Sequence, residues 1–275
     1  MPAPIKGSLV GRGRTADVFD WEGGRVLKLF NTEMNPESCR REYAIAKAIH
    51  DQCGEGPAVF DFIELEGRPG IVYEKLEGHD MLATIFSQPW TLPSQVNTFA
   101  DIHHRIRQNT APEGLPDGKT LLRRDIGHAD LLEDSVKERL YILLAGLPDD
   151  DKLCHMDYHP GNIQLTHRGP AVMDWLTACR GAPAMDIART AMMLEGADLP
   201  DAGGLKQALA RMVQGTTYSR YLKRTLALTG IPRWEVDAWM LPVMGARLAE
   251  NIPGSERPRL LVRIQSTLPD TLEVL

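Results

Sequence analysis

Short runs of apolar and polar residues, broken by glycines, dominate the first part of the chain. β-branched and aromatic residues in runs of this length, separated by glycine, are typical of strands joined by tight turns. Gly23 and Gly24 form one expected turn, and a second is expected from Glu66 to Gly70. The pattern therefore predicts an antiparallel sheet, with strands within residues 7–21, 25–30 and 58–78.

The period of the pattern changes over residues 36–50, which open with a proline. Tyr43, Ala46 and Ile49 recur at three-residue spacing, which places them on one face of a helix. Asn35 directly precedes the proline, and asparagine is a favoured residue at a helix N-cap. We therefore expect a single helix within this region of strands.

Helical spacing dominates the chain from His79 onward. One segment, residues 152–175, returns to short apolar runs and predicts a small hairpin or a strand-loop-strand among the helices. Together the two patterns predict an α+β, bilobal fold, with a sheet-containing lobe over 1–78 and a mainly helical lobe over 79–275. The helices are expected at 81–87, 94–108, 121–147 with a possible break near Gly127, 186–194, 205–228, 234–251 and 256–267.

Composition excludes several classes of protein. The chain has 275 residues, of which 43% are hydrophobic and 25% charged, so we expect folded globular lobes and not a disordered chain. The net charge of -6 gives no basic excess for nucleic acid. The apolar stretch 140–147 is too short to span a membrane. Four scattered cysteines and an N-terminus unlike a signal peptide predict a cytoplasmic setting.

The densest group of chemically useful residues lies in the segment CHMDYHPGNIQL. Asp157 stands five positions before Asn162, and Asp174 follows twelve positions later. Phosphoryl transfer needs a carboxylate beside the acceptor hydroxyl and oxygen ligands for the magnesium that bridges the phosphates. The spacing therefore indicates a phosphotransferase loop, although Pro160 and Gly161 would also suit an ordinary turn.

The same segment allows a metal-dependent enzyme as an alternative. His155, Asp157 and His159 alternate as they would on one face of a strand, and two histidines with one carboxylate can hold iron or zinc. The proline and glycine that follow His159 favour a loop instead.

Near the N-terminus, Gly11 and Gly13 lie between two expected strands, where glycines let backbone N–H groups approach a phosphate. Lys28 follows inside an apolar strand, a position that rarely keeps a charge unless it is paired or faces a ligand. Glu42 on the first helix is the expected partner, with Glu37 as its rival.

The ordered set of glycine loop, strand lysine, helix glutamate, H-x-D-x-x-x-x-N and later aspartate resembles the aminoglycoside phosphotransferase and choline kinase group of the protein-kinase-like fold. Its most specific strings are CHMDYHPGNIQLT, VMDW and GAPAMDIA. Two positions depart from the family pattern, which has glycine at Met156 and aspartate at Ala182.

The resemblance implies a role for each matching residue. Asp157 would be the catalytic base, and Asn162 and Asp174 the magnesium ligands. Lys28 and Glu42 would position the phosphates of ATP. The remaining assignments are the backbone of Glu74 and Leu76 for adenine, Tyr73 for the gatekeeper position, and His155 and Asp186 for support of the catalytic loop.

The expected activity is transfer of the γ-phosphoryl group of ATP, assisted by Mg²⁺, to a hydroxyl of a small aminoglycoside-like molecule or metabolite. Only residues 175–185 separate Asp174 from Asp186, and no A-P-E string follows, so a protein acceptor is not expected. A nucleotide-binding pseudokinase is the rival interpretation. The acceptor, the choice of ATP or GTP and the oligomeric state stay open, with Glu195, Glu250 and Trp175 as candidates for the acceptor pocket.

Overall fold

The computed structural model describes residues 6–196, 204–252 and 254–268, and within helix α7 not the side chains of 205–207 and 209. The chain forms two compact units, and each unit is built from several segments that alternate along the sequence. Unit 1 contains Met1–Thr84, Pro112–Gly114 and Gly161–Thr177, and unit 2 contains Ile85–Ala111, Leu115–Pro160 and Ala178–Leu275.

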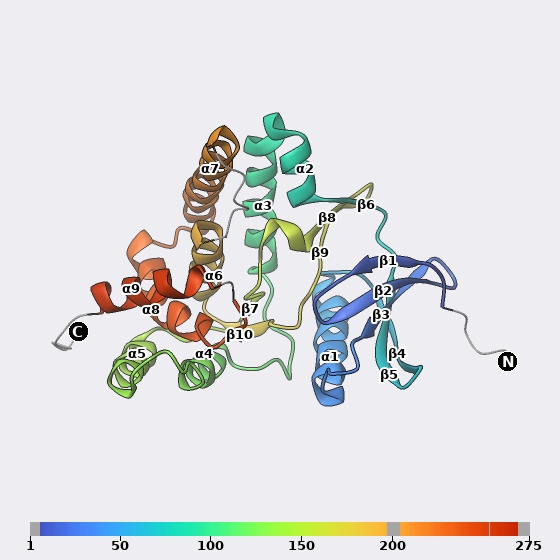
Figure 1. The fold of residues 1–275 in the computed structure, drawn as a ribbon, viewed down its shortest axis with the longest axis horizontal. Helices are drawn as coiled ribbons and strands as arrows, with labels where there is room; N and C mark the ends of the chain where they lie inside the picture. Colours follow the sequence, from blue (N-terminus) through green and yellow to red (C-terminus); the bar gives the residue numbers. More distant parts are fainter. Residues whose placement is uncertain (1–5, 197–203, 253, 269–275) are drawn as a thin grey trace. The chain divides into compact units, whose positions relative to one another are not determined.

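Unit 1 contains an antiparallel sheet of five strands, which confirms the predicted N-terminal sheet (Figure 1). The turn between its last two strands in sequence has two residues, Glu66 and Gly67, both with positive φ. This conformation suits a tight hairpin, and the turn is shorter than predicted because Arg68 to Gly70 already pair with the preceding strand. The strands follow the order β1 (Leu9–Arg12), β2 (Ala16–Trp21), β3 (Arg25–Phe30), β5 (Arg68–Glu74) and β4 (Val59–Leu65).

Helix α1 (Pro36–Cys53) packs on this sheet. The Asn35 side chain accepts a hydrogen bond from the Glu37 N–H at 2.9 Å, which confirms the predicted N-cap. The helix extends three residues beyond its expected end and stops at Gly54, which has φ +67°. Its buried face joins a core cluster that includes Phe30, Cys39, Ala46, Val59 and Ile71.

Unit 1 also contains a second, three-stranded sheet. β6 (Gly78–Asp80) pairs with β8 (Ile163–Thr166), which pairs with β9 (Gly169–Val172). The compact units therefore differ from the contiguous lobes 1–78 and 79–275, because this pairing joins residues 161–177 to the N-terminal segment. The assignment of nucleotide and acceptor binding to those two lobes stays a prediction.

The hairpin expected within residues 152–175 is present, but it covers only residues 163–172. β7 (Lys152–Cys154) pairs in unit 2 with β10 (Cys179–Gly181), whereas β8 and β9 form a hairpin in unit 1. Local sequence shows that these segments are strands, but their partners lie elsewhere in the chain.

Unit 2 is mainly helical, as predicted. α3 (Leu92–Ile106) packs against α7 (Gly204–Thr229), and α6 (Pro183–Gly196) packs against α7 and α8 (Arg233–Arg247). Three further helices contact α8, namely α4 (Gly118–Gly127), α5 (Asp134–Gly146) and α9 (Glu256–Thr267). The helix predicted over 121–147 is two helices, α4 and α5, separated just after Gly127. No helix of the described residues is long and apolar enough to cross a membrane. Helix α2 (Met81–Ser87) contains the boundary between the two units, which lies after Thr84. Short 3-10 turns lie at Pro89–Thr91 and Pro160–Asn162.

The pairing of β6 with β8 depends on the absence of a side chain at Gly78. A Cβ there would lie 2.0 Å from the backbone oxygen of Leu165, which cannot move without breaking the sheet. We expect Gly78→Ala to lower the free energy of unfolding by about 2–3 kcal/mol, measured by urea unfolding. Gly146→Ala is the control, because a Cβ at Gly146 meets nothing within 4 Å. Equal stability of the two variants would contradict this close approach.

Candidate active site

A buried ion pair joins the first sheet to α1 in unit 1. Lys28 lies on β3 between Leu27 and Leu29, which are fully buried. Its Nζ lies 2.5 Å from Oε1 of Glu42, and the two side chains are only 18% and 3% exposed. Glu37 is exposed in the first turn of α1. Glu42 is therefore the partner of the strand lysine, as predicted in preference to Glu37.

The charges in this cluster depend on one another. Burial alone would lower the pKa of Lys28, but the carboxylates of Asp174 and Glu42 outweigh burial and raise it. Burial raises the pKa of Glu42, and Lys28 opposes that rise. Tyr73 hydrogen-bonds to Glu42, and burial raises the pKa of its hydroxyl well above the ordinary value. The lysine therefore stays charged at neutral pH.

Asp174 is a second carboxylate close to Lys28. Its Oδ1 is 3.8 Å from Nζ of Lys28, and its side chain is 48% exposed. The residue follows β9 with φ +61°, a left-handed conformation that few residues other than glycine adopt. Aspartate is among the residues that adopt it at moderate cost. The exposed carboxylate can accept a ligand while Lys28 compensates part of its charge.

The register of β8 and β9 brings the two predicted metal ligands to the same end of their hairpin. Ile163 pairs with Val172, and the Met173 N–H donates to the backbone oxygen of Asn162 at 2.8 Å. An amide oxygen and a carboxylate are hard ligands of the kind Mg²⁺ prefers, with phosphates and water completing its shell. This donor set fits magnesium.

Apart from Glu42 on α1, the predicted nucleotide-binding residues lie on the five-stranded sheet or close to the ends of its strands. Gly11 is on β1, and Gly13 begins the turn to β2, where its N–H donates to the Ala16 oxygen at 2.8 Å. Glu74 is the last residue of β5, and Leu76 lies in the segment before β6. The Glu74 side chain forms an ion pair with Arg168, which anchors the end of β5 to the turn between β8 and β9. Their roles in nucleotide binding stay predictions.

The loop that carries Asp157 is part of unit 2. β7 ends at Cys154, and residues 155–159 form no regular secondary structure. The alternative in which His155, Asp157 and His159 lie on one face of a strand is therefore wrong. The Asp157 N–H donates to Nδ1 of His155 at 3.2 Å, within the loop. Among the described residues, no group of three or more histidine, cysteine, aspartate or glutamate side chains is arranged to hold a metal.

Asp186, at the start of α6, holds this loop from a fully buried position. Its carboxylate accepts from the N–H groups of His155 at 3.0 Å and Met156 at 2.9 Å. Met156 has φ +63°, the conformation that the glycine of the family motif adopts freely. Holding a methionine there costs about 1 kcal/mol, which the hydrogen bond to Asp186 helps to offset.

A buried histidine that the motifs did not reveal completes the support of the loop. His103 of α3 lies with Nε2 2.8 Å from the Asp186 carboxylate and Nδ1 2.7 Å from the Tyr221 hydroxyl. Burial, and then the charge of Arg107, lower the pKa of His103 to about 3. The neutral ring therefore donates through Nε2 and accepts through Nδ1. His103 follows the buried Phe99 by four residues, which places both on the same face of α3. That spacing was the signal in the sequence that His103 would be buried.

Asp186 remains ionised in this buried position. Burial alone would raise its pKa, but His103, the charge of Arg107 and the backbone donors lower it. The loop is held by a carboxylate that keeps its charge, and not by a neutral acid. This geometry suits the predicted supporting role of His155 and Asp186.

The three candidates for an acceptor pocket have other contacts. Glu250 forms ion pairs with Arg189 at 2.6 Å and Arg247 at 2.5 Å. Arg189 also donates to the Met156 oxygen at 3.0 Å, so Glu250 belongs to a network that contacts the loop carrying Asp157. Glu195 forms an ion pair with Arg263, and Trp175 is buried within unit 1.

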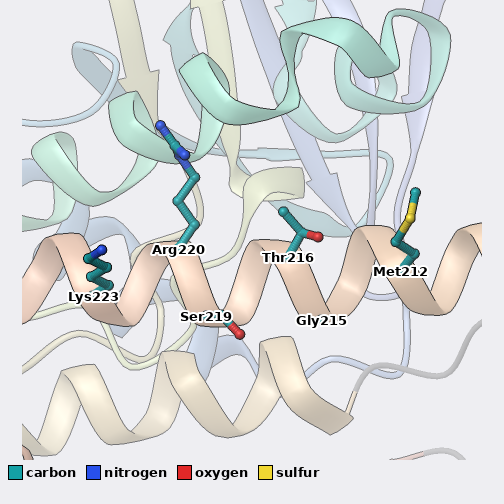
Figure 2. Close-up of a pocket in the computed structure, with 6 residues that line it drawn as sticks. All are labelled: Met212, Gly215, Thr216, Ser219, Arg220 and Lys223. Atoms are coloured by element: carbon teal, nitrogen blue, oxygen red, sulfur yellow. The ribbon is translucent and has the colours of Figure 1, made fainter.

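A pocket of about 520 Å³ lies along α7, away from the residues singled out by motif. Figure 2 shows Met212, Thr216 and Arg220 on one side of the helix and Ser219 on the other. Arg220 donates to the Pro93 oxygen and to Asn97 of α3, each at 2.9 Å. Gly215 and Lys223 complete the lining.

One family model matches most of the chain. The model of the phosphotransferase enzyme family, APH, matches residues 8–222. No curated protein sequence matches the chain.

Several solved structures share the fold. An aminoglycoside-3'-phosphotransferase of type VIII is 15% identical, with a TM-score of 0.61 over 90% of this chain and 94% of that one. APH(2")-IIa, solved as a ternary complex with streptomycin and ATP, is 15% identical, with a TM-score of 0.56 over 97% and 92%. A choline kinase from Cryptosporidium parvum Iowa II is 9% identical, with a TM-score of 0.56 over 96% and 90%. At these identities the likeness shows the protein-kinase-like fold.

The neutral state of His103 predicts a specific dependence of stability on pH. Below about pH 6.5 this histidine is protonated in the unfolded chain but not in the folded protein. The free energy of unfolding therefore decreases as the pH is lowered. Between about pH 6.5 and 5, wild type should lose up to about 1.4 kcal/mol per pH unit more than His103→Asn. Urea unfolding at several pH values measures the difference. His128→Asn, at an exposed histidine, should follow wild type. Parallel curves for wild type and His103→Asn would show that His103 is not held neutral.

Proposed function

This chain belongs to the phosphotransferase enzyme family, and from that premise we propose that it transfers the γ-phosphoryl group of ATP to a hydroxyl of a small molecule, with Mg²⁺. The observation that carries the proposal is that Lys28 lies 2.5 Å from the carboxylate of Glu42 and 3.8 Å from that of Asp174, with Asn162 at the same hairpin end as Asp174. A buried lysine shared by two carboxylates has a fixed position and a retained charge, which suits phosphate binding.

In this proposal, Lys28 binds the α- and β-phosphates and Glu42 holds its ammonium group in place. Gly11 and Gly13 let the backbone approach the phosphates, and the backbone at Glu74 and Leu76 binds adenine. Asn162 and Asp174 hold Mg²⁺, which neutralises the phosphate charge when bound.

Asp157 then acts on the acceptor. Its carboxylate would orient the acceptor hydroxyl and take up its proton as the hydroxyl oxygen bonds to the γ-phosphorus and the bond from that phosphorus to the ADP oxygen breaks. The backbone that carries Asp157 is held by Asp186, so the carboxylate is positioned before the acceptor arrives. Most of the rate enhancement would come from this positioning and from charge neutralisation.

A small acceptor is favoured over a protein by the interval after Asp174. Only residues 175–185 separate it from Asp186, and β10 together with the start of α6 occupies most of that length. Too little chain remains for a loop that would support a peptide. Use of ATP and four free cysteines fit a cytoplasmic enzyme.

The first test is a screen for ADP formation over aminoglycosides, amino alcohols, sugars and other hydroxylated metabolites. With an acceptor identified, Asp157→Asn should lower kcat at least about 100-fold while nucleotide still binds, because the amide cannot accept the proton. Asp130→Asn, at an exposed site of the same unit, should leave kcat unchanged. Near wild-type turnover by Asp157→Asn would rule out its role as base.

The second test concerns the metal. ATP with Mg²⁺ should raise Tm, by an amount equivalent to about 2.7 kcal/mol at 100 times Kd, because it binds only the folded state. Asp174→Ala should lose most of the Mg²⁺-dependent part, which is the difference between ATP with Mg²⁺ and ATP with EDTA. Asp61→Ala, exposed on β4, is the control. An undiminished Mg²⁺ effect in Asp174→Ala would remove Asp174 from the metal site.

A further inference from the structure

Trp175, the residue after Asp174, is buried to 3% exposure in unit 1. Its indole Nε1–H donates to the Val172 oxygen at 3.1 Å, so the side chain turns back over the end of β9. The hydrogen bond closes a short loop around Met173 and Asp174. The backbone at Asp174 is therefore constrained from its C-terminal side.

The segment after α1 lies directly against this indole. A Cβ added to Gly56 would lie 2.7 Å from Nε1 of Trp175 and 3.3 Å from both Cδ1 and the Val172 oxygen. Real Cβ atoms essentially never approach other atoms as closely as the first of these distances. The Gly56 oxygen is 3.3 Å from Nδ1 of His50, which ties the segment to the last turn of α1. Only glycine leaves room for the indole here.

Residues 172–175 are thus linked to α1 in two places. Glu42, in the first half of α1, binds Lys28, which lies 3.8 Å from Asp174. At the other end of the helix, Gly56 packs on Trp175. The first link acts through charge and the second through close packing, so movement of α1 would disturb both.

We propose that Trp175 is a positioning residue for the Mg²⁺ site, held between Gly56 and Val172 so that Asp174 keeps its left-handed backbone beside Lys28. The metal-binding carboxylate is then preset, and no activating modification is needed to orient it. This inference rests on the proposed function, because it assigns the contact a role in Mg²⁺ binding.

The chain offers a matched pair of glycines for the test. Gly54 and Gly56 have φ of +67° and +75°, so alanine introduces similar backbone strain at both. A Cβ at Gly54 meets nothing within 4 Å, whereas one at Gly56 meets Trp175. Gly56→Ala should therefore raise the Mg²⁺ concentration for half of the ATP-dependent Tm increase about tenfold, and Gly54→Ala should leave it unchanged.

Trp175→Phe tests the same contact from the other side. Phenylalanine keeps a buried ring but lacks the N–H that donates to Val172, so the half-saturating Mg²⁺ concentration should again rise about tenfold. In the double variant, the Gly56→Ala change should add little, because the atom that its Cβ meets is gone. Hydrogen exchange without ligand should be faster for residues 172–175 in both single variants than in Gly54→Ala.

The outcomes separate this inference from the proposed function. A wild-type protein with no Tm increase from ATP and Mg²⁺, and no turnover, overturns both. A normal increase in wild type overturns this inference alone if Gly56→Ala matches Gly54→Ala, or if the effects of Gly56→Ala and Trp175→Phe simply add. If Gly56→Ala does not fold, Trp175→Phe decides by itself, and wild-type Mg²⁺ dependence in that variant overturns the inference.

Discussion

The ion pair of Lys28 and Glu42 is the constraint on which unit 1 depends. A buried charge costs several kcal/mol unless it is paired, and loss of one partner of a buried pair typically costs about 3–5 kcal/mol. The sheet therefore tolerates Lys28 only while α1 presents Glu42 in one position. That requirement fixes the helix against β3 and leaves the ammonium group directed toward Asp174. The structural need to neutralise a charge and the proposed need to bind phosphates are met by the same geometry.

Unit 2 uses a buried carboxylate in a comparable way. Asp186 is fully buried, but two backbone N–H groups and the neutral ring of His103 satisfy its oxygens. A charged acceptor forms stronger hydrogen bonds than a neutral one, so it can hold the loop in a conformation that Met156 does not favour. In each unit, therefore, a buried acid holds a residue or loop of the candidate site in place. In neither case does the acid itself need to reach a substrate.

The sequence predicted the residues whose significance is local. Lys28 stands out because it is charged within an apolar strand, and Asp157 and Asn162 because their spacing suits a phosphotransferase loop. The roles of these residues in catalysis remain predictions. Features that depend on distant pairing were missed or misassigned: β7 pairs with β10, and β8 with β6. His103 was missed, and the contacts of Trp175 were not foreseen, because a buried polar or aromatic side chain reveals its partner only after the chain has folded.

The pairing of β6 with β8 has a consequence for the order in which the protein folds. Asp80 pairs with Gln164, so the N-terminal segment of unit 1 lacks part of its sheet until much of unit 2 has been synthesised. Closing such a long loop is entropically costly, and it delays the last contacts of the unit. On the ribosome, residues 1–80 would emerge first with β6 as an unpaired edge, a site where an incomplete chain can associate with another.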